Sequence, residues 1–207
     1  MYLKANSVSM EINGRKLFDN ISLEVNRGES LAIVGPSGSG KTTLLNCLAL
    51  LQRPSSGSIT IDEKNYDAHK RKDVLSFWKK EAAIIYQDSG VIDDETISYN
   101  VSLRRAIGKK KTNTAIEEAL RIVGLGGRGA EIAAVLSGGE KRRLGVARAI
   151  YKDASVIFAD EPTASLDARN RALVANLLLQ QAAGGRTVII ATHDMELAES
   201  CDLVLNL

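Results

Sequence analysis

The chain has 207 residues, of which 44% are hydrophobic and 25% are charged, so it is long enough to bury the core of one domain. Its 27 Lys and Arg residues nearly balance its 25 Asp and Glu residues, which leaves a net charge of +2 and no broad basic field for nucleic acid. The two cysteines, Cys47 and Cys201, have no metal or redox spacing, which is typical of reduced thiols in a cytosolic protein. The N-terminus lacks a secretory pattern, and the most apolar stretch is too short to span a bilayer.

Apolar residues alternate on both sides of the turn dipeptide Asn13-Gly14, which predicts an opening pair of antiparallel strands. After it, apolar runs alternate with segments of helical spacing, so an α/β fold with a mostly parallel sheet is expected. In chain order we expect strands 8–12, 21–25 and 31–34, helix 42–51, strands 59–61 and 83–86, a mostly helical segment 98–123, helix 140–151, strand 156–159, helix 168–183, strand 187–191, a short helix from Met195 and strand 203–207. Residues 70–73 are expected to form a solvated loop and residues 124–129 a flexible connector.

A glycine-rich loop joins strand 31–34 to the next helix. It matches the pattern GxxxxGK[ST], in the strand-to-helix context that this pattern requires, with residues Gly35, Pro36, Ser37, Gly38, Ser39, Gly40, Lys41 and Thr42. The glycines allow backbone N–H groups to turn toward polyphosphate oxygens. Lys41 is expected to face the β and γ phosphates, and the Thr42 hydroxyl to ligate Mg²⁺. A glycine-rich turn without a ligand is the alternative, and the complete match in the right context argues against it.

Two acidic residues follow the apolar strand 156–159. Asp160 and Glu161 are expected at the carboxyl edge of the sheet, where α/β folds bind their ligands. We expect Asp160 to hold the Mg²⁺ shell and Glu161 to orient the attacking water. A strand that ends in two acids is commonly only a solvated strand end, so this interpretation depends on the phosphate loop. Together the two motifs predict a nucleotide hydrolase.

A second pair of glycines precedes helix 140–151. Ser137 lies three residues before Glu140, which is a capping-box arrangement. The capping box does not explain Gly138 and Gly139, which leave N–H groups of the helix start open to an anion. With Leu136 before it, this string closely resembles the signature motif of the ATP-binding cassette (ABC) ATPases, which lies ahead of the strand that ends in the two acids.

The resemblance covers roughly residues 8–207. It implies a P-loop core with an antiparallel β subdomain, over residues 1–87 and 146–207, and a helical subdomain over about residues 88–145. In this family the signature of one subunit closes over ATP held by the phosphate loop of another. The resemblance therefore implies ATP and Mg²⁺ as cofactors, a homodimer formed with ATP, and nucleotide contacts by the signature residues and by Thr43.

The same motif order assigns three further elements. Gln87 resembles the Q-loop residue, which contacts Mg²⁺ and water and couples to a transmembrane partner. Ser165-Leu166-Asp167 resembles the D-loop, and His193 resembles the switch histidine that senses the γ-phosphate. Taken alone, Gln87 is an ordinary strand end and a histidine at a strand end is more often structural.

Three features depart from the family pattern. Ile12 stands where an aromatic residue usually stacks on adenine, so base selectivity is expected to be loose. The chain stops at Leu207, so no C-terminal regulatory domain is expected. Residues 88–96 are unusually acidic, so docking of a partner is expected to differ there.

The resemblance implies the ATPase subunit of a membrane transporter, cytoplasmic and peripheral on the inner face of the membrane, with an integral membrane permease as partner and no nucleic acid. Glu140 in place of the commoner glutamine, with the compact length, resembles the subgroup for lipoprotein release, macrolide or peptide export and bacteriocin immunity. An exporter of a peptide, lipid-linked or drug-like substrate is therefore expected. A non-transport cassette acting on nucleic acid is the alternative, and no coiled coil or basic linker between Gly35 and His193 supports it. A third alternative is a regulatory ATPase of a membrane complex that hydrolyses ATP without moving a substrate.

Overall fold

The computed structural model describes residues 2–66, 71–104 and 110–207. Strands and helices alternate along most of this part of the chain, as expected for a sheet covered by helices. In chain order the elements are β1 (Leu3–Ile12), β2 (Arg15–Val25), β3 (Ser30–Val34), α1 (Lys41–Leu48), β4 (Ser56–Ile61), β5 (Lys64–Tyr66), α2 (Arg71–Lys80), β6 (Ala82–Ile85), α3 (Ile97–Ser102), α4 (Lys110–Ile122), the 3₁₀ turn Ala133–Val135, α5 (Gly138–Lys152), β7 (Val156–Asp160), α6 (Ala168–Ala183), β8 (Thr187–Ala191), α7 (Met195–Glu199) and β9 (Leu203–Asn206).

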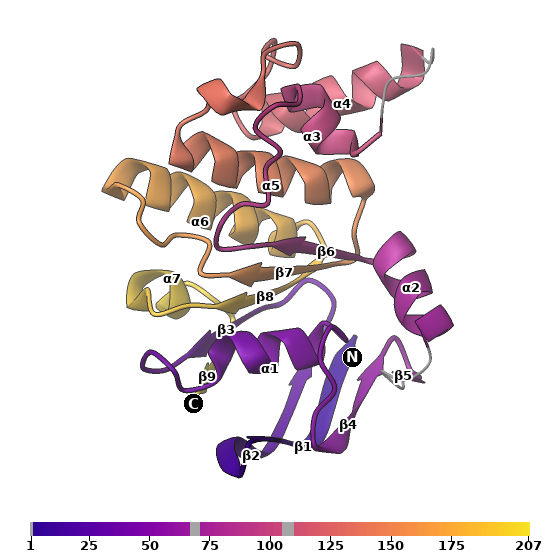
Figure 1. Ribbon diagram of the computed structural model, residues 1–207, viewed down its shortest axis with the longest axis vertical. Helices are drawn as coiled ribbons and strands as arrows, with labels where there is room; N and C mark the ends of the chain where they lie inside the picture. The colour runs from indigo at the N-terminus through magenta and orange to yellow at the C-terminus, as the bar shows by residue number, and fades with distance from the viewer. Residues whose placement is uncertain (1, 67–70, 105–109) are drawn as a thin grey trace.

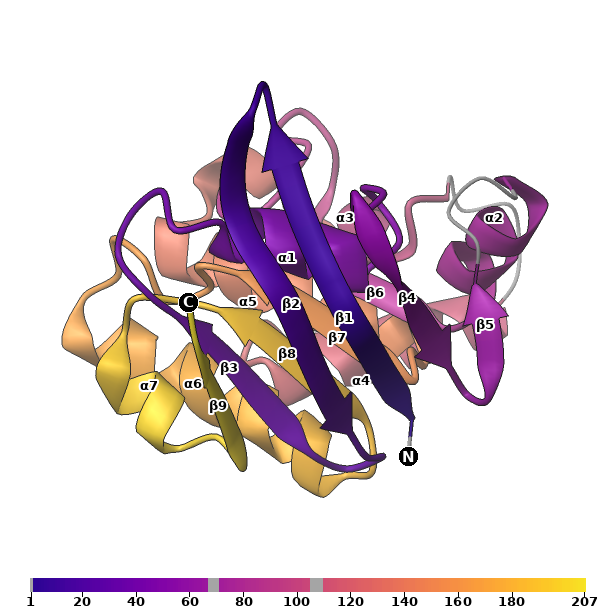
Figure 2. The ribbon, with the colours of Figure 1, turned by 90° about the horizontal axis from the view of Figure 1, so that it is seen from below.

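Two sheets form separate layers in the described part of the chain. One is parallel, with five strands in the order β6-β7-β8-β3-β9, and the other is antiparallel, with the order β2-β1-β4-β5. Helix α1 lies between the two sheets, and α5 and α6 cover the opposite face of the parallel sheet (Figures 1 and 2). The predicted α/β class is therefore confirmed, and the antiparallel layer is larger than the predicted strand pair.

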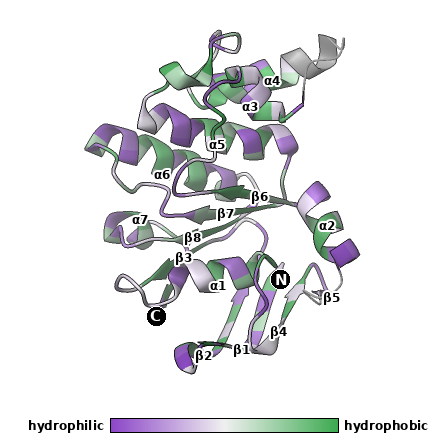
Figure 3. Ribbon diagram, in the orientation of Figure 1, coloured by the Kyte–Doolittle hydropathy of each residue, from purple (hydrophilic) through white to green (hydrophobic). Residues whose placement is uncertain are grey.

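The central strands are apolar along most of their length because both faces of the parallel sheet are covered. Figure 3 shows hydrophobic residues gathered along β6, β7 and β8. In β7, Val156 and Phe158 join the core on the side of α1, whereas Ile157 and Ala159 join the core on the side of α5 and α6. Successive side chains of a strand point to opposite faces, so one strand supports two cores.

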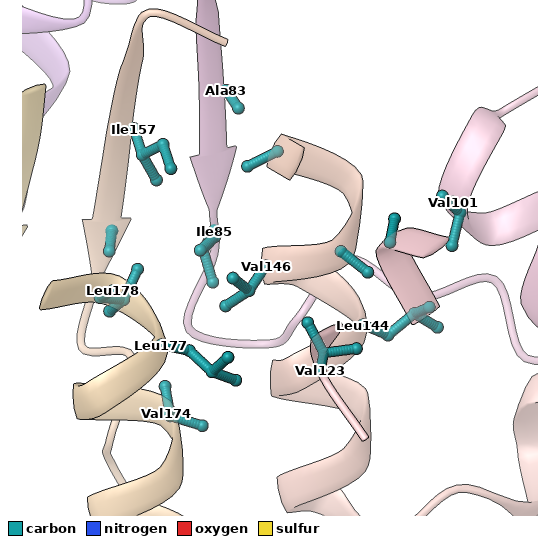
Figure 4. Close-up of a cluster of buried hydrophobic side chains, with 14 of the residues drawn as sticks. Ala83, Ile85, Val101, Val123, Leu144, Val146, Ile157, Val174, Leu177 and Leu178 are labelled. Atoms are coloured by element: carbon teal, nitrogen blue, oxygen red, sulfur yellow. The ribbon is translucent and has the colours of Figure 1, made fainter. Parts of the chain in front are cut away.

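The core on the helical side connects the parallel sheet to the helical layer. Figure 4 shows Ile85 of β6 facing Val146 of α5, with Leu177 and Leu178 of α6 beside them. The contact is close, because a Cβ added at Gly145 of α5 would lie 3.3 Å from the Ile85 side chain. Helix α5 therefore packs against β6, and it also contacts α3 and α4 of the helical layer.

Two sequence predictions are wrong. Residues 71–73 begin helix α2 instead of a solvated loop, and Lys70 lies outside the described residues. Phe77 of this helix is fully buried and packs against the rings of Trp78 and Phe158, so the helix covers the edge of the sheet at β6. A solvated segment could not supply this apolar contact.

The stretch 124–129 is a hydrogen-bonded turn and not a loose connector. Leu125 is fully buried, and its N–H donates to the Leu120 carbonyl at 2.8 Å. The Gly129 carbonyl accepts from the Ser98 N–H at 2.9 Å, and a Cβ at Gly129 would lie 2.4 Å from Ser98 Oγ. The turn is therefore packed against the start of α3.

The middle segment contains α3 and α4, as predicted, although residues 105–109 lie outside the described part. Helix α3 ends at Ser102 and is followed by its C-cap residue Leu103, which adopts the left-handed conformation with φ of 51°. The division into a core and a helical subdomain over residues 88–145 stays a prediction. Among the helices that the structure describes, none has both the length and the apolar character needed to cross a bilayer.

Candidate active site

The predicted site residues other than the signature lie where the parallel strands end. Ile85 of β6 pairs with Ala159 of β7, and Asp160 of β7 pairs with Ala191 of β8, which in turn pairs with Ile33 of β3. All four strands run in the same direction, so the loops that follow them leave from the same edge of the sheet. The phosphate loop, the acidic pair, the predicted switch histidine and Gln87 therefore share that edge.

The phosphate loop has the backbone conformation that its glycines allow. Gly38 and Gly40 have φ angles of 78° and 100°, in the left-handed region that favours glycine. A Cβ at Gly40 would also lie 3.2 Å from the Phe18 ring, so the loop lies against β2. Helix α1 begins at Lys41 without a side-chain cap, which leaves its first N–H groups available to an anion.

Two further polar groups of this loop are suited to a ligand. Ser39 Oγ is buried and has no hydrogen-bond partner among the described residues. The Lys41 ammonium is almost fully buried and donates to the carbonyls of Gly35 at 2.9 Å and Pro36 at 3.1 Å. Lys41 therefore lies folded over its own loop, and a polyphosphate there would meet a cation at short range. Thr43 follows in the first turn of α1 and is half-buried.

Thr42 and Asp160 meet across the site. Thr42 Oγ1 donates to Asp160 Oδ1 at 2.9 Å, although 118 positions separate them in the sequence. Burial raises the pKa of Asp160 above its ordinary value, and the neighbouring Glu161 carboxylate adds to this, against the hydrogen bond from Thr42. The Thr42 hydroxyl and the Asp160 carboxylate are the hard oxygen ligands that Mg²⁺ prefers. The raised pKa of Asp160 shows that its carboxylate would be stabilised by a cation. The residues present therefore suit the predicted ion.

Glu161 is the central carboxylate of the site. Its Oε1 lies 4.0 Å from Lys41 Nζ, and its Oε2 lies 2.8 Å from His193 Nδ1. The His193 N–H also donates to Oε2 at 3.3 Å, as does the Thr192 hydroxyl at 3.4 Å. Glu161 has a φ of 46°, a strained conformation for a residue with a side chain. Such strain is concentrated at functional sites, and here it follows directly after β7.

The structure adds Arg142, which the sequence analysis missed. This buried arginine of α5 donates to the Tyr86 carbonyl at 2.6 Å and to the Ala164 carbonyl at 3.5 Å. It therefore joins the strand end before Gln87 to the segment after Glu161. The sequence around Arg142 does not reveal its role, because its hydrogen-bond acceptors belong to two segments that are distant in the sequence.

The signature residues form the predicted capping box. Ser137 Oγ accepts from the Glu140 N–H at 3.3 Å, and a Glu140 carboxylate oxygen accepts from the Ser137 N–H at 2.8 Å. Gly139 is packed so closely that an added Cβ would lie 2.5 Å from Asn170 Cγ, whereas Gly138 has nothing within 4 Å. Among the described residues, no hydrogen bond or ion pair joins the signature to the phosphate loop.

Other predicted positions lie as follows. Gln87 is exposed just beyond β6, and Asp167 caps helix α6 by accepting from the Asn170 N–H at 3.0 Å. Ile12 is 41% exposed at the end of β1, so no ring stands at the position where the family places one.

A parallel sheet with a glycine-rich phosphate loop after one strand and a pair of acidic residues after another is the arrangement of a P-loop nucleotide hydrolase. The model of the ABC transporter family matches residues 18–164. The chain belongs to this family and is an ATP-binding cassette that hydrolyses ATP with Mg²⁺.

Several relatives and structures resemble the chain over most of its length. It is 33% identical over 198 residues to the ABC transporter ATP-binding protein YknY of Bacillus subtilis, covering 93% of this chain and 86% of that protein. It is 34% identical to the lipoprotein-releasing system ATP-binding protein LolD of Bacteroides thetaiotaomicron, covering 99% and 96%. It is 38% identical to the L-cystine import ATP-binding protein TcyN of Bacillus subtilis, covering 86% and 71%.

A solved structure of similar shape is the dimeric ATP-binding cassette MJ0796 in a post-hydrolysis state with ADP and Pi. It superposes with a TM-score of 0.87 at 28% identity, covering 99% of this chain and 94% of that one. The expected family and the P-loop fold are therefore confirmed.

Proposed function

We propose that this ATPase powers a membrane transporter from the inner face of the membrane, bound to an integral membrane permease and paired with a second copy of itself when ATP is present. The observation that carries the proposal is an apolar groove beside Gln87, described below. Its lining includes Tyr86 and Gly90, which flank Gln87 in the sequence.

The geometry supports a distinct role for each predicted residue. Lys41 and the backbone of the phosphate loop would hold the β and γ phosphates. Glu161 would orient the attacking water and take up its proton, and His193 would hold the Glu161 carboxylate in place through Nδ1. Thr42 and Asp160, with Gln87, would hold Mg²⁺, which supplies positive charge against the phosphates when bound.

The groove has a volume of about 720 Å³ and runs from the end of β6 to α3 and α5. Tyr86, Gly90 and Ile92 line it on either side of Gln87 in the sequence, so an occupant would contact the segment that carries Gln87. Four basic residues line it as well, namely Lys79, Arg104, Arg148 and Lys152. An apolar helix of the permease with a carboxylate near its tip fits this lining.

Anchors fix the groove to the rest of the domain. Arg148 of α5 donates to the Ser89 carbonyl at 3.2 Å and to Asn100 Oδ1 at 2.8 Å. Asn100 is fully buried, and its Oδ1 accepts from the Ile92 N–H at 2.8 Å. Movement of an occupant would therefore be transmitted to two elements. One is α5, which begins within the signature, and the other is the loop after Gln87, which leaves the edge of the sheet that would hold ATP.

We propose an exporter of a peptide, lipid-linked or drug-like substrate. The support is Glu140 in the signature and the similarity to lipoprotein-releasing ATPases. Import proteins such as TcyN and PstB 2 of Natronomonas pharaonis are similar to the same degree. The direction of transport thus rests on the identity of the permease.

The first experiment replaces Glu161 with glutamine. Glu161→Gln should bind ATP, hydrolyse it very slowly and elute as a dimer on size exclusion, because the carboxylate is lost while the phosphate loop remains. Glu24→Gln, which changes an exposed carboxylate of β2, serves as the control and should behave as wild type. Wild-type hydrolysis by Glu161→Gln would contradict the role given to this carboxylate.

The second experiment tests the partner. The Glu161→Gln chain with ATP is used as bait on detergent-solubilised membranes, and an integral membrane protein should be retained. Adding Ile92→Asp, which changes a groove residue that is 45% exposed, should abolish retention. Adding Val204→Asp, which changes a residue of edge strand β9 that is 46% exposed, should not. Capture of nucleic acid instead of a membrane protein would favour the non-transport alternative.

A further inference from the structure

The signature motif of this chain places a carboxylate at a helix start that is expected to face phosphate. Both oxygens of Glu140 have partners: one accepts from the Ser137 N–H at 2.8 Å, and the other accepts from Nη1 of Arg128. Arg128 is nine positions before Ser137, in the turn after α4, and belongs to no motif of the sequence. The pair therefore comes from the packing of this turn against the start of α5.

The charge of Glu140 needs an explanation. Burial alone would raise the pKa of Glu140, but the hydrogen bonds from Ser137 and Arg128 outweigh it and leave the pKa below its ordinary value. An ionised carboxylate is stable at a helix start, where the backbone N–H groups attract negative charge. A phosphate at Gly138 and Gly139 would seek the same N–H groups, so a free Glu140 side chain would compete with it and repel it.

Arg128 is held in a fixed orientation. Its Nε donates to both oxygens of Glu131, at 3.1 and 3.0 Å, and its Nη2 donates to Oε2 of Glu131 at 2.8 Å. The remaining nitrogen, Nη1, reaches Glu140. The backbone of the turn is anchored as well, because the Gly127 N–H donates to Glu117 Oε1 at 2.6 Å. A planar guanidinium can bind two carboxylates through separate nitrogens in a fixed geometry, whereas the ammonium of a lysine has all its donors on one nitrogen and no planar fork.

The exposed fractions of the two side chains show that the pair lies at the protein surface. The Arg128 side chain is 31% exposed and the Glu140 side chain is 23% exposed. An ion pair of this exposure adds little to folding stability. Its larger effect is therefore expected on a charged ligand that approaches the same surface.

We propose that Arg128 is a positioning residue for the nucleotide. It turns the Glu140 carboxylate back toward the 125–131 turn and offsets its charge. The N–H groups of Gly138 and Gly139 and the Ser137 hydroxyl are thereby left to the γ-phosphate of ATP held by the second copy of the chain. This inference rests on the proposed ATP-dependent pairing of two copies.

The test is a double-mutant cycle on ATP hydrolysis. Arg128→Gln should raise the ATP concentration for half-maximal rate by roughly fivefold, the size expected when one partly exposed ion pair beside a phosphate is lost, with a smaller change in kcat. In a Glu140→Gln background, the same Arg128→Gln change should have less than about a twofold effect, because no carboxylate is left to restrain. Arg71→Gln, which changes an exposed arginine of α2, is the matched control and should leave the ATP dependence unchanged.

Two outcomes would overturn the inference. One is an equal effect of Arg128→Gln in both backgrounds, and the other is no effect in either. Melting temperatures without ATP should be similar for all variants, and a loss of ATP affinity that followed a loss of melting temperature would show a merely structural role. A wild-type chain that neither hydrolyses ATP nor pairs would instead contradict the proposed function.

Discussion

The two adjacent glycines of the signature should respond to alanine in opposite ways. A Cβ at Gly139 would lie 2.5 Å from Cγ, 2.6 Å from Oδ1 and 2.9 Å from Cβ of Asn170. The Asn170 side chain has little freedom to move away, because its Nδ2 donates to Asp167 Oδ2 at 2.5 Å. A Cβ at Gly138 meets nothing within 4 Å.

The magnitudes follow from this packing. Overpacking costs about 1–3 kcal/mol, and the better helix propensity of alanine returns up to about 1 kcal/mol. Gly139→Ala should therefore lower the free energy of unfolding by about 1–2 kcal/mol, or the melting temperature by roughly 3–6 °C in a chain of this length. Gly138→Ala should leave stability unchanged or slightly higher, yet it should weaken ATP-dependent pairing, because its methyl group stands beside the open N–H groups.

Urea unfolding without nucleotide and size exclusion with ATP in the Glu161→Gln background measure the two effects separately. Asn170→Ala removes the two closest atoms, so combining it with Gly139→Ala should recover most of the lost stability. A Gly139→Ala chain as stable as wild type, or one that Asn170→Ala does not relieve, would refute the packing argument.

Two other predictions concern the phosphate loop and the edge of the sheet. Lys41→Ala should abolish ATP binding, measured by calorimetry, because the loop loses its side-chain cation, and retained tight binding would contradict the role of Lys41. Asp202 accepts from the Ser30 hydroxyl at 2.6 Å and the Ser30 N–H at 2.8 Å, and these bonds hold the pKa of Asp202 below its ordinary value. The resulting stability is present above the ordinary pKa and is lost as the pH falls through the lowered one. Ser30→Ala should thus cost roughly 0.5–1 kcal/mol in urea unfolding at pH 7 and less near pH 3, and an equal loss at both would exclude this linkage.

The sequence predicts those parts of the site whose residues are contiguous along the chain. The phosphate loop and the pair Asp160 and Glu161 each depend on a local strand end, so spacing alone reveals them. Arg142 and the pairing of Arg128 with Glu140 could not be found in this way, because the Tyr86 carbonyl and the Glu140 carboxylate lie on segments that only the packing of α5 brings near these arginines. Nothing in their own neighbourhood of the sequence distinguishes them from solvated arginines.

The two mistaken predictions about the fold have a common physical cause. For α2 and for the 124–129 turn, the prediction of a solvated or flexible segment followed the charged and glycine-rich composition and overlooked the side chains that become buried. Four basic residues of α2 hide the helical spacing of Val74, Phe77 and Trp78, which pack beside the sheet. In the turn, four glycines hide Leu125, whose full burial fixes the segment. One buried side chain of this size is worth about 2 kcal/mol, which is enough to order a short segment that charge or glycine content alone would leave solvated.

The capping box and the anion site at the start of α5 use different groups, so one sequence string can serve both. Ser137 and Glu140 satisfy each other's backbone N–H groups, which stabilises the helix within the chain. The N–H groups of Gly138 and Gly139 fall between them and have no acceptor within the helix. A glutamine at position 140 would close the same box without adding charge. The glutamate of this chain needs a cation beside it, and Arg128 supplies that cation from outside the motif.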